Sequence, residues 1–452
     1  MKVVVAAHGF PPKQIAGAEW QAHRTAKFLS DQGHDVSVVA VDEIDASLPE
    51  MLRVVDEQVD GISVTRLSYN LAQRWGDATE YDNPIVFDYF QKRFEQERPD
   101  VLHIYSGYQL TSSVIRVAKQ YGVKVLINLT DFWFLCPRIT LTKSTGEVCQ
   151  VPDDPLACAL CLHSEQRRLR IPHRLSRGKS SDLILSTMQR GWLPKGGLVR
   201  TRDYIEARRA RLLQDLRQAD CIMSNSRFLG GLFMQHGIDP RKIAYVRQGM
   251  NRDRWVVAAP AETTREAVHI GYIGQIAAHK GVKELVEAFR QLPFSAETAK
   301  LYIYGDIDSA WPAFREQLLR TIGNDPRIIL AGRFANPNLP KVHANLDALV
   351  VPSLWYENSP NVILESFSLG TPVIASNLGG MAELVQHDIN GRLFAAGDVA
   401  ALSDELNAII SYPAMLSRYV QNMPPIPTID AEMTQLLDLY ADLITYEQPL
   451  PI

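Results

Sequence analysis

Two glutamates, Glu357 and Glu365, are separated by seven residues and flank a predicted helix start. The loop that carries Glu357 follows a β-branched apolar run over 348–351, which predicts a buried strand. Ser359 is expected to cap a helix that begins at Pro360 and contains Glu365. A helix start offers unpaired N–H groups and a positive dipole end, which favour an anion or a sugar hydroxyl beside the carboxylates. The same residues also fit an ordinary capped helix with one loop glutamate and one surface glutamate.

The elements around these carboxylates predict a parallel strand–helix–strand unit. Gly370 is expected to end the helix, and Pro372 releases the chain into a second apolar strand over 373–375. In open α/β sheets, ligands bind at the carboxyl ends of the strands. We therefore expect an α/β domain with a ligand site in the loop that carries Glu357.

Lys280 is a third group suited to this chemistry. It precedes Gly281 at a predicted helix start that follows a strand beginning near His269. An ammonium group facing a pyrophosphate stabilises the negative charge that grows on a leaving group. The alternative, a surface lysine at a helix start, runs against the helix dipole. Lys280 is therefore a candidate phosphate ligand.

The residues around the two glutamates resemble a known family. After Glu357 and Glu365 come a Gly-Gly pair at 379–380, Glu383 and an Asn-Gly pair at 390–391. This block resembles the Glu-x7-Glu region of the retaining family 4 glycosyltransferases, which have the GT-B fold. The resemblance implies an α/β chain with two Rossmann-like domains facing across a cleft and a C-terminal helix that crosses back to the N-terminal domain. No Asp-x-Asp appears in the metal-binding context typical of GT-A enzymes, so no cofactor is implied for catalysis.

The resemblance also assigns site residues. Glu357 would hold the sugar hydroxyls and Lys280 the pyrophosphate, and Asp131 is the third catalytic assignment. The donor-binding positions are Gly17, Ala18, His103, Thr130, Gln248, Gln275, Gly332, Arg333, Phe334, Ser359, Asn361, Val362 and Glu365, the last for the ribose hydroxyls. At Gly17 a small residue lets backbone N–H groups approach a phosphate. Without the resemblance, the loop at Gly17 is an ordinary strand-to-helix turn, and His103 is an ordinary packed strand histidine.

Two positions depart from the family pattern. Thr130 precedes Asp131 where relatives have a histidine that contacts the donor sugar, which leaves the identity of the sugar open. Gln275 stands where an arginine is usual, so one of two cations is missing, and Arg247 or Arg333 is a substitute. These departures keep a catalytically inactive binding or scaffold protein among the alternatives.

Length and composition set the remaining bounds. A chain of 452 residues predicts two domains, which we place at 1–250 and 251–430, with the C-terminal helix in 431–452. The net charge of −4 gives no case for nucleic acid as a partner. The first apolar residues are expected to form a strand, because they are too few for the apolar region of a signal peptide. No apolar run in the sequence is long enough to span a bilayer. We expect a cytoplasmic chain, acting at the inner face of the membrane if its acceptor is a lipid.

An insert over 136–217 carries two unusual features. Four of the five cysteines fall within it, at Cys136, Cys149, Cys158 and Cys161. Four thiolates ending in Cys-x-x-Cys suggest a structural zinc site, with an iron–sulfur cluster or four buried thiols as alternatives. Residues 165–217 hold 14 Lys+Arg against 5 Asp+Glu. This segment fits either a contact with an anionic membrane or a diphosphate-lipid acceptor, or a solvated basic helix pair.

The resemblance therefore implies a retaining hexosyltransferase that uses a UDP or GDP sugar. The acceptor is expected to be a glycan or a lipid-linked glycan, in bacterial cell-surface polysaccharide or glycolipid synthesis. A sugar-nucleotide epimerase of GT-B fold is one alternative, and incubation with the donor alone would reveal it. A nicotinamide dehydrogenase is disfavoured because the Gly-x-Gly-x-x-Gly fingerprint is missing after the first strand.

Overall fold

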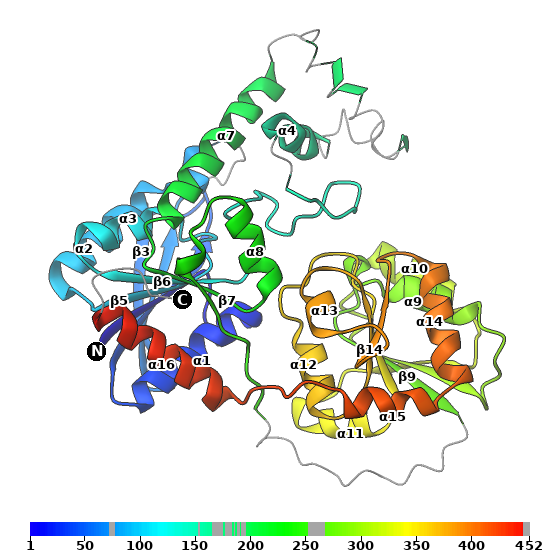
Figure 1. The fold of residues 1–452 in the computed structure, drawn as a ribbon. Helices are drawn as coiled ribbons and strands as arrows, with labels where there is room; N and C mark the ends of the chain where they lie inside the picture. Colours follow the sequence, from blue (N-terminus) through cyan, green and yellow to red (C-terminus); the bar gives the residue numbers. More distant parts are fainter. Residues whose placement is uncertain are drawn as a thin grey trace. The chain divides into compact units, whose positions relative to one another are not determined.

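The computed structural model describes residues 1–71, 77–151, 154–164, 196–251 and 267–445, together with 175, 176, 183, 184, 186, 187 and 190. The chain divides into two compact units. Unit 1 comprises Met1–Asn225, Leu229–Val246 and Met433–Ile452, and unit 2 comprises Ser226–Phe228 and Arg247–Glu432. Figure 1 shows the elements of both units in the colours of the sequence. The predicted interdomain linker over 256–266 lies outside the described residues.

Unit 1 is built on an eight-stranded sheet of order β3-β4-β2-β1-β5-β6-β7-β8, in which only β3 runs antiparallel to its neighbour. Its strands are β1 (Lys2–Ala7), β2 (Asp35–Ile44), β3 (Leu52–Val59), β4 (Ile62–Tyr69), β5 (Val101–Tyr105), β6 (Lys124–Leu129), β7 (Cys221–Ser224) and β8 (Ile243–Tyr245). Its helices are α1 (Gly17–Asp31), α2 (Pro84–Glu97), α3 (Ser113–Gln120), α4 (Pro155–His163), α7 (Gly197–Leu216), most of α8 (Arg227–Gln235) and most of α16 (Ile429–Thr445). The central strands are continuous apolar runs because helices cover both faces of a parallel sheet.

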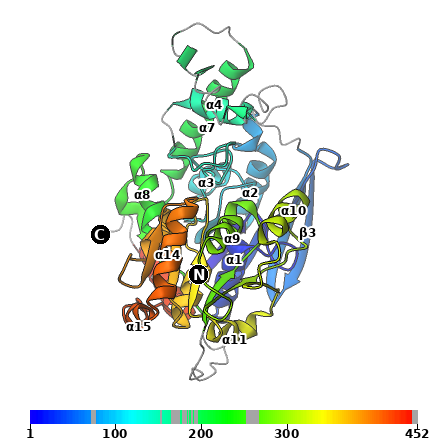
Figure 2. The same ribbon diagram turned by 90° about the vertical axis from the view of Figure 1, so that its right-hand side faces the viewer.

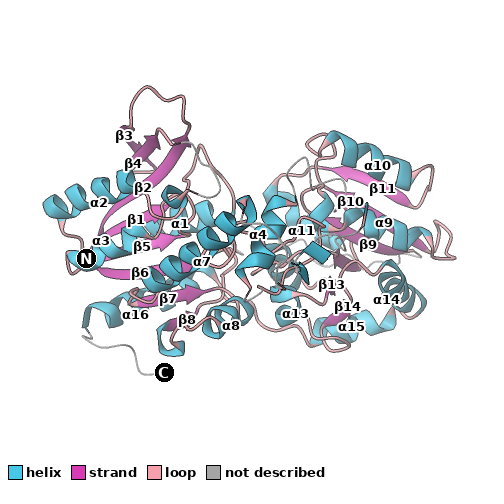
Figure 3. Cartoon of the chain, turned by 90° about the horizontal axis from the view of Figure 1, so that it is seen from above, coloured by secondary structure: helices cyan, strands magenta, loops and turns pink. Residues whose placement is uncertain are grey.

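Unit 2 is built on a six-stranded parallel sheet of order β11-β10-β9-β12-β13-β14. Its strands are β9 (Val268–Ile273), β10 (Ala299–Tyr304), β11 (Ile328–Gly332), β12 (Ala348–Val351), β13 (Val373–Ser376) and β14 (Gly391–Phe394). Its helices are α9 (Val282–Arg290), α10 (Pro312–Ile322), α11 (Leu339–Ala344), α12 (Asn361–Ser368), α13 (Gly379–Leu384), α14 (Val399–Ser411) and α15 (Ala414–Gln421). Figure 3 shows both sheets from above, and α14 lies beside α9 in Figure 2. The predicted α/β class with two Rossmann-like domains is confirmed.

The C-terminal helix α16 returns to unit 1 and packs on its core through a buried histidine. Tyr440 is fully buried, and its hydroxyl lies 2.6 Å from Nδ1 of His103 on β5. Burial lowers the pKa of His103 to about 3, so the imidazole is neutral. The structure places the His103 side chain in the core, and its assignment to donor binding stays a prediction. The predicted return of the last helix is confirmed.

Helix α7 is held on unit 1 by buried charge pairs, which changes the interpretation of the basic segment. Arg208 is 1% exposed, and its guanidinium donates to Glu80 at 2.8 and 3.2 Å and to the Trp133 carbonyl at 2.9 Å. The guanidinium also lies over the Trp133 ring, 5.1 Å from its centre. Arg208 therefore belongs to the interior of unit 1 and not to a basic surface for a membrane.

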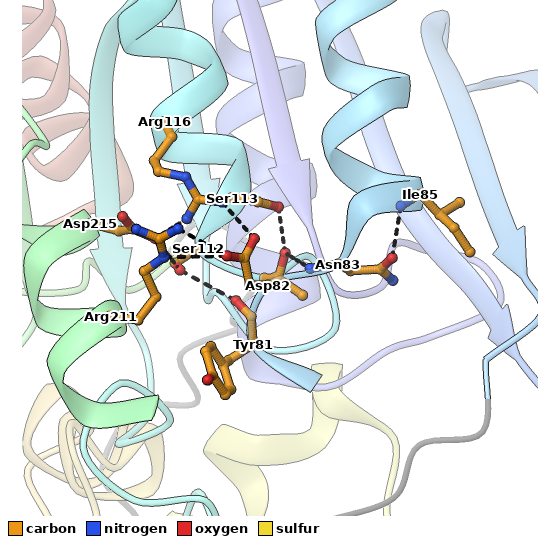
Figure 4. A network of polar contacts seen from close by, with 10 residues as sticks. Tyr81, Asp82, Asn83, Ile85, Ser112, Ser113, Arg116, Arg211 and Asp215 are labelled. Atoms are coloured by element: carbon orange, nitrogen blue, oxygen red, sulfur yellow. Dashed lines mark hydrogen bonds and ion pairs between the residues drawn. The ribbon is translucent and has the colours of Figure 1, made fainter. Parts of the chain in front are cut away.

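A second charge network ties α7 to α3. Arg116 on α3 donates to Asp215 and to Asp82, each at 2.5 Å, and Arg211 on α7 donates to Asp82 at 3.2 Å (Figure 4). The Ser112 hydroxyl completes the set by donating to Asp215 at 2.6 Å. Arg211 is thus engaged in the fold as well. The first part of the basic segment, over 165–174, lies outside the described residues.

Candidate active site

Lys280 and Glu357 lie together at the carboxyl edge of the sheet of unit 2. Lys280 ends a short 3-10 turn after β9, and Glu357 is in the loop after β12. Because β9 and β12 are hydrogen-bonded neighbours, the residues that follow them meet at the same edge. The Lys280 Nζ donates to Glu357 Oε1 at 2.6 Å. The sequence therefore identified two groups that the fold does bring together.

Three donors converge on one oxygen of Glu357. Its Oε1 accepts from Lys280 Nζ at 2.6 Å, from Trp355 Nε1 at 2.8 Å and from the Ser353 hydroxyl at 3.1 Å. Burial raises the pKa of Glu357, but the charge of Lys280 and these three hydrogen bonds outweigh burial and lower it below the usual value. Glu357 is therefore an ionised carboxylate at neutral pH, able to accept hydrogen bonds and unable to donate them.

Helix α12 starts beside this carboxylate without a side-chain cap. The helix begins at Asn361, its N-cap is Pro360, and no side chain bonds the first N–H groups. The prediction that Ser359 caps a helix starting at Pro360 is wrong, because the cap position falls on the proline itself. Asn361 is exposed, and the uncapped N–H groups are available to an anion. Glu365 lies inside α12, and burial raises its pKa.

Two glycine positions explain how these loops pack. At Gly281, φ is 71° and an added Cβ would lie 1.8 Å from the Pro352 carbonyl oxygen. At Gly380, an added Cβ would lie 1.8 Å from the carbonyl oxygen of Asn358, and the Gly380 N–H donates to the Glu357 carbonyl at 2.8 Å. The glycines next to Lys280 and after β13 therefore let backbone segments approach closely enough to fix the loop of Glu357.

The other sequence-predicted residues of unit 2 are more dispersed. Gly332 ends β11, and Arg333 and Phe334 follow it; β10 separates β11 from β9 in the sheet. The Arg333 side chain is 79% exposed and lies 3.5 Å from Asp306. Phe334 and Val362 pack against the core of unit 2, and Gln275 is exposed.

Arg247 is engaged at a different place in unit 2. It forms an ion pair with Glu383 at 3.3 Å. A cavity of about 220 Å³ is lined by Arg247, Glu383, Leu384, Gln386, Asn390, Asn422, Pro424 and Pro425. Gln248, the next residue, is buried. In the described residues, neither Arg247 nor Arg333 pairs with Glu357. That one of them replaces the arginine usual at position 275 stays a prediction.

Unit 1 has its own set of polar groups at the carboxyl edge of its sheet. Asp131 follows β6 and accepts from the Ser106 hydroxyl at 2.6 Å, from the Trp133 N–H at 2.8 Å and from Thr130 at 3.4 Å. Asp131 therefore orders its own loop. A catalytic role for Asp131 stays a prediction, as does a donor contact of Thr130.

The first loop of unit 1 has an uncapped helix start. Helix α1 begins at Gly17 after Ala16, with no side-chain cap, and nothing lies within 4 Å of a Cβ added at Gly17. This leaves room for the anion that the sequence predicts at Gly17 and Ala18. In the same loop, His8 Nε2 lies 3.2 Å from the buried Glu19. Burial lowers the pKa of His8, but the bond to Glu19 and the nearby carboxylates raise it overall.

The four cysteines of the insert lie close enough to affect one another. Burial raises the pKa of Cys158 to about 12, with further contributions from Cys136, Cys149 and Cys161. None of the cysteines forms a disulfide. Among the residues that the structure describes, no group of three or more His, Cys, Asp or Glu is placed so that it would hold a metal ion. The residues as placed do not fit a metal, and the predicted structural zinc stays a prediction for elemental analysis.

Sequence reasoning missed His279 and Trp355, which complete the site of unit 2. Their rings pack at 4.1 Å between centres, and Trp355 lies two residues before Glu357. A tryptophan in a polar loop next to a candidate carboxylate was the available signal. Within the described part of the chain, no helix is both long and apolar enough to cross a membrane.

Comparison with known proteins agrees with this geometry. Residues 267–411, in unit 2, match the family Glycosyl transferases group 1, and residues 16–150, in unit 1, match the Glycosyl transferase 4-like domain. Among solved structures, Alr3699/HepE from Anabaena in complex with UDP has a TM-score of 0.62 at 15% identity, over 98% of this chain and 100% of that one. Sucrose-phosphate synthase from Thermosynechococcus elongatus has a TM-score of 0.62 at 18% identity, over 98% and 99%. The fold is GT-B. Each unit thus matches a domain family of glycosyltransferases, one in unit 1 and one in unit 2.

The curated relatives match over shorter stretches. Uncharacterized glycosyltransferase MJ1607 from Methanocaldococcus jannaschii is 31% identical over 120 residues, which is 26% of this chain and 30% of that protein. The 2-deoxystreptamine glucosyltransferase of Streptomyces kanamyceticus is 29% identical over 188 residues, which is 39% of this chain and 48% of that protein. The chain thus spans less than half the length of these relatives.

Proposed function

We propose that this protein is a retaining glycosyltransferase that moves a sugar from a nucleotide-diphosphate sugar to a glycan or lipid-linked acceptor. The observation that carries the proposal is the Lys280–Glu357 pair beside the uncapped start of α12. An ammonium group, an ionised carboxylate and free helix N–H groups are the groups that a diphosphate sugar requires. HepE, a structural neighbour, was solved in complex with UDP-glucose, which supports a nucleotide sugar as the donor.

Each of these groups has a role in the proposed reaction. Lys280 stabilises the diphosphate as the bond between its oxygen and the anomeric carbon breaks, and the N–H groups at Asn361 assist. Glu357 holds sugar hydroxyls, and Glu365 holds the ribose hydroxyls. The acceptor oxygen bonds the anomeric carbon on the face that the diphosphate leaves. Because the new bond forms on that face, the α configuration is retained. The proton of the acceptor hydroxyl passes to the departing phosphate.

A binding screen tests the donor part of this proposal. UDP, GDP and ADP, each free and as its hexose conjugate, are added to the full chain, and the melting temperature is measured. A ligand that binds the folded state at 100 times its Kd stabilises it by about 2.7 kcal/mol. Stabilisation by one nucleotide family supports the proposal, whereas no shift with any of them refutes it.

A lysine variant tests the chemical role of Lys280. In Lys280→Ala, turnover is expected to fall by about 10²–10³-fold, because the charge growing on the leaving group loses its counter-ion. Lys341→Ala is the matched control, since Lys341 is an exposed lysine of unit 2. The assay is donor hydrolysis without acceptor, followed by NMR. Initial release of the α anomer supports retention, and release of the β anomer overturns it. A new nucleotide sugar among the products would instead show an epimerase.

A further inference from the structure

Trp355 and His279 form a support that holds Glu357 in one position. The Trp355 indole donates to Glu357 Oε1 at 2.8 Å, and the His279 ring packs on the indole with 4.1 Å between ring centres. The two loops are also joined through the backbone, because the Leu354 N–H donates to the His279 carbonyl at 2.8 Å. The ammonium of Lys280 lies 5.2 Å from the centre of the indole ring. The indole therefore contacts the cation, the carboxylate and the imidazole of this site.

The two oxygens of Glu357 have different surroundings. All three of its donors, from Lys280, Trp355 and Ser353, bond Oε1. In the described residues, no hydrogen bond or ion pair involves Oε2. The Glu357 side chain is 18% exposed, so it is partly accessible. The protein thus occupies one oxygen completely and leaves the other to a ligand.

The charge state of this site restricts the ligand that Oε2 accepts. Because Glu357 is ionised, Oε2 bonds groups that donate, such as sugar hydroxyls, and repels a carboxylate. The imidazole of His279 does not compensate, because burial, followed by the charge of Lys280, lowers its pKa and keeps it neutral at pH 7. The only cation that contacts Glu357 among the described residues is Lys280, which the diphosphate also attracts.

We propose that Trp355 and His279 are positioning residues, which hold Glu357 so that its Oε2 accepts a hydrogen bond from a hydroxyl of the donor sugar. The site then binds a neutral hexose in preference to the matching uronic acid. This inference rests on the proposed function and adds the class of donor sugar to it. The indole contributes its N–H, which is the part of the Trp355 side chain that hydrogen-bonds the carboxylate. The contribution of the imidazole is its flat face, since that face packs on the indole.

The test compares Trp355→Phe with the wild type and with Trp311→Phe. Phenylalanine keeps an aromatic ring but removes the N–H, and Trp311 is a matched control because it is 77% exposed in the same unit. Calorimetric titrations measure binding of the free nucleotide and of its hexose conjugate. If the binding screen selects uridine nucleotides, the ligands are UDP and either UDP-glucose or UDP-galactose; if it selects guanosine nucleotides, they are GDP and GDP-mannose. For Trp355→Phe, affinity for the hexose conjugate is expected to fall by about 10–100-fold while affinity for the nucleotide changes by less than about twofold.

Three further titrations complete the test. His279→Phe keeps a flat ring and is expected to retain most of the affinity for the hexose conjugate, whereas His279→Ala is expected to lose about tenfold. The wild type is expected to bind the matching uronate, UDP-glucuronate, UDP-galacturonate or GDP-mannuronate, at least about tenfold more weakly than the neutral hexose conjugate.

The outcomes separate this inference from the proposed function. If the wild type binds none of the nucleotides, the proposed function fails and the inference fails with it. If the wild type binds them but Trp355→Phe weakens nucleotide and conjugate equally, or weakens neither, the positioning role is overturned and the proposed function stands. If the uronate binds as tightly as the neutral conjugate, the preference for a neutral sugar is overturned. A large drop in the melting temperature of Trp355→Phe without ligand would show a structural role instead.

Discussion

Removing Arg208 tests whether buried charge pairs attach α7 to unit 1. Arg208→Met keeps most of the apolar stem but removes the guanidinium that donates twice to Glu80, at 2.8 and 3.2 Å. Leaving one partner of a buried pair unpaired costs about 3–5 kcal/mol. The Glu80 side chain is 18% exposed and keeps its bonds from Tyr204 at 2.8 Å and Trp133 at 3.0 Å. These features reduce the expected loss in unfolding free energy to about 2–3 kcal/mol.

The assay is urea unfolding of the wild type and of Arg208→Met, with Arg200→Met as the control. Arg200 is an exposed arginine of the same helix, so its replacement is expected to change stability by no more than about 0.5 kcal/mol. If Arg208→Met costs no more than Arg200→Met, buried pairing does not hold α7, and the interpretation of Arg208 as an interior residue is refuted.

The pH dependence of the same loss tests its electrostatic cause. Burial raises the pKa of Glu80, but the charge and hydrogen bonds of Arg208, with bonds from Tyr204 and Trp133, outweigh burial and lower it overall. A carboxyl with a lowered native pKa contributes stability above its unfolded pKa, and that contribution is lost as the pH falls through the native value. The difference between wild type and Arg208→Met should therefore persist at neutral pH and shrink as the pH falls below 4.5, the ordinary pKa of a glutamate. A difference that stays constant would show that packing, and not charge, is responsible.

Three further predictions concern other parts of the chain. Gly380→Ala places a Cβ 1.8 Å from the Asn358 carbonyl oxygen and so displaces the loop of Glu357. Affinity for the nucleotide sugar, measured by calorimetry, should fall at least about tenfold; unchanged affinity would contradict the packing argument. Tyr440→Phe leaves His103 Nδ1 buried without its 2.6 Å partner, so urea unfolding should show a loss of about 1–3 kcal/mol, and no loss would argue against this contact. The raised pKa of Cys158, about 12 through burial, predicts that iodoacetamide at pH 7.5 alkylates it slowly in the folded protein and rapidly after unfolding, which peptide mass spectrometry measures.

Local patterns in the sequence predicted the elements that carry the site of unit 2. The apolar run over 348–351 is β12, the predicted strand over 373–375 is β13, and the helix expected from residue 360 begins one position later as α12. These elements are specified by residues close together in the chain, through strand propensity and a glycine stop. The pairing of Lys280 with Glu357 was also predictable, because both follow strands whose carboxyl ends meet at one edge.

Long-range packing decides the assignments that the sequence missed. The strand pattern alone makes His103 an ordinary packed histidine, but it does not reveal the partner Tyr440, which is 337 residues away on the last helix. Arg208 looks like part of a solvated basic helix, but its partner Glu80 is 128 residues away. The packing of His279 on Trp355 is a side-chain contact between two separate loops, which the residues of neither loop specify alone. Charge and polarity alone do not distinguish a buried partner from a surface group.

The neutral Lys280–Glu357 pair and the indole that contacts both residues form one arrangement. In the proposed reaction, a bound diphosphate carries more negative charge than one carboxylate and attracts Lys280 away from Glu357. Glu357 then keeps two of its three donors, Trp355 at 2.8 Å and Ser353 at 3.1 Å. Without the indole N–H, the carboxylate would lose its shorter remaining bond at the moment when the donor sugar arrives. Because Lys280 is the cation paired with Glu357 in the described part of the chain, the proposed sugar recognition depends on Trp355 once Lys280 turns to the diphosphate.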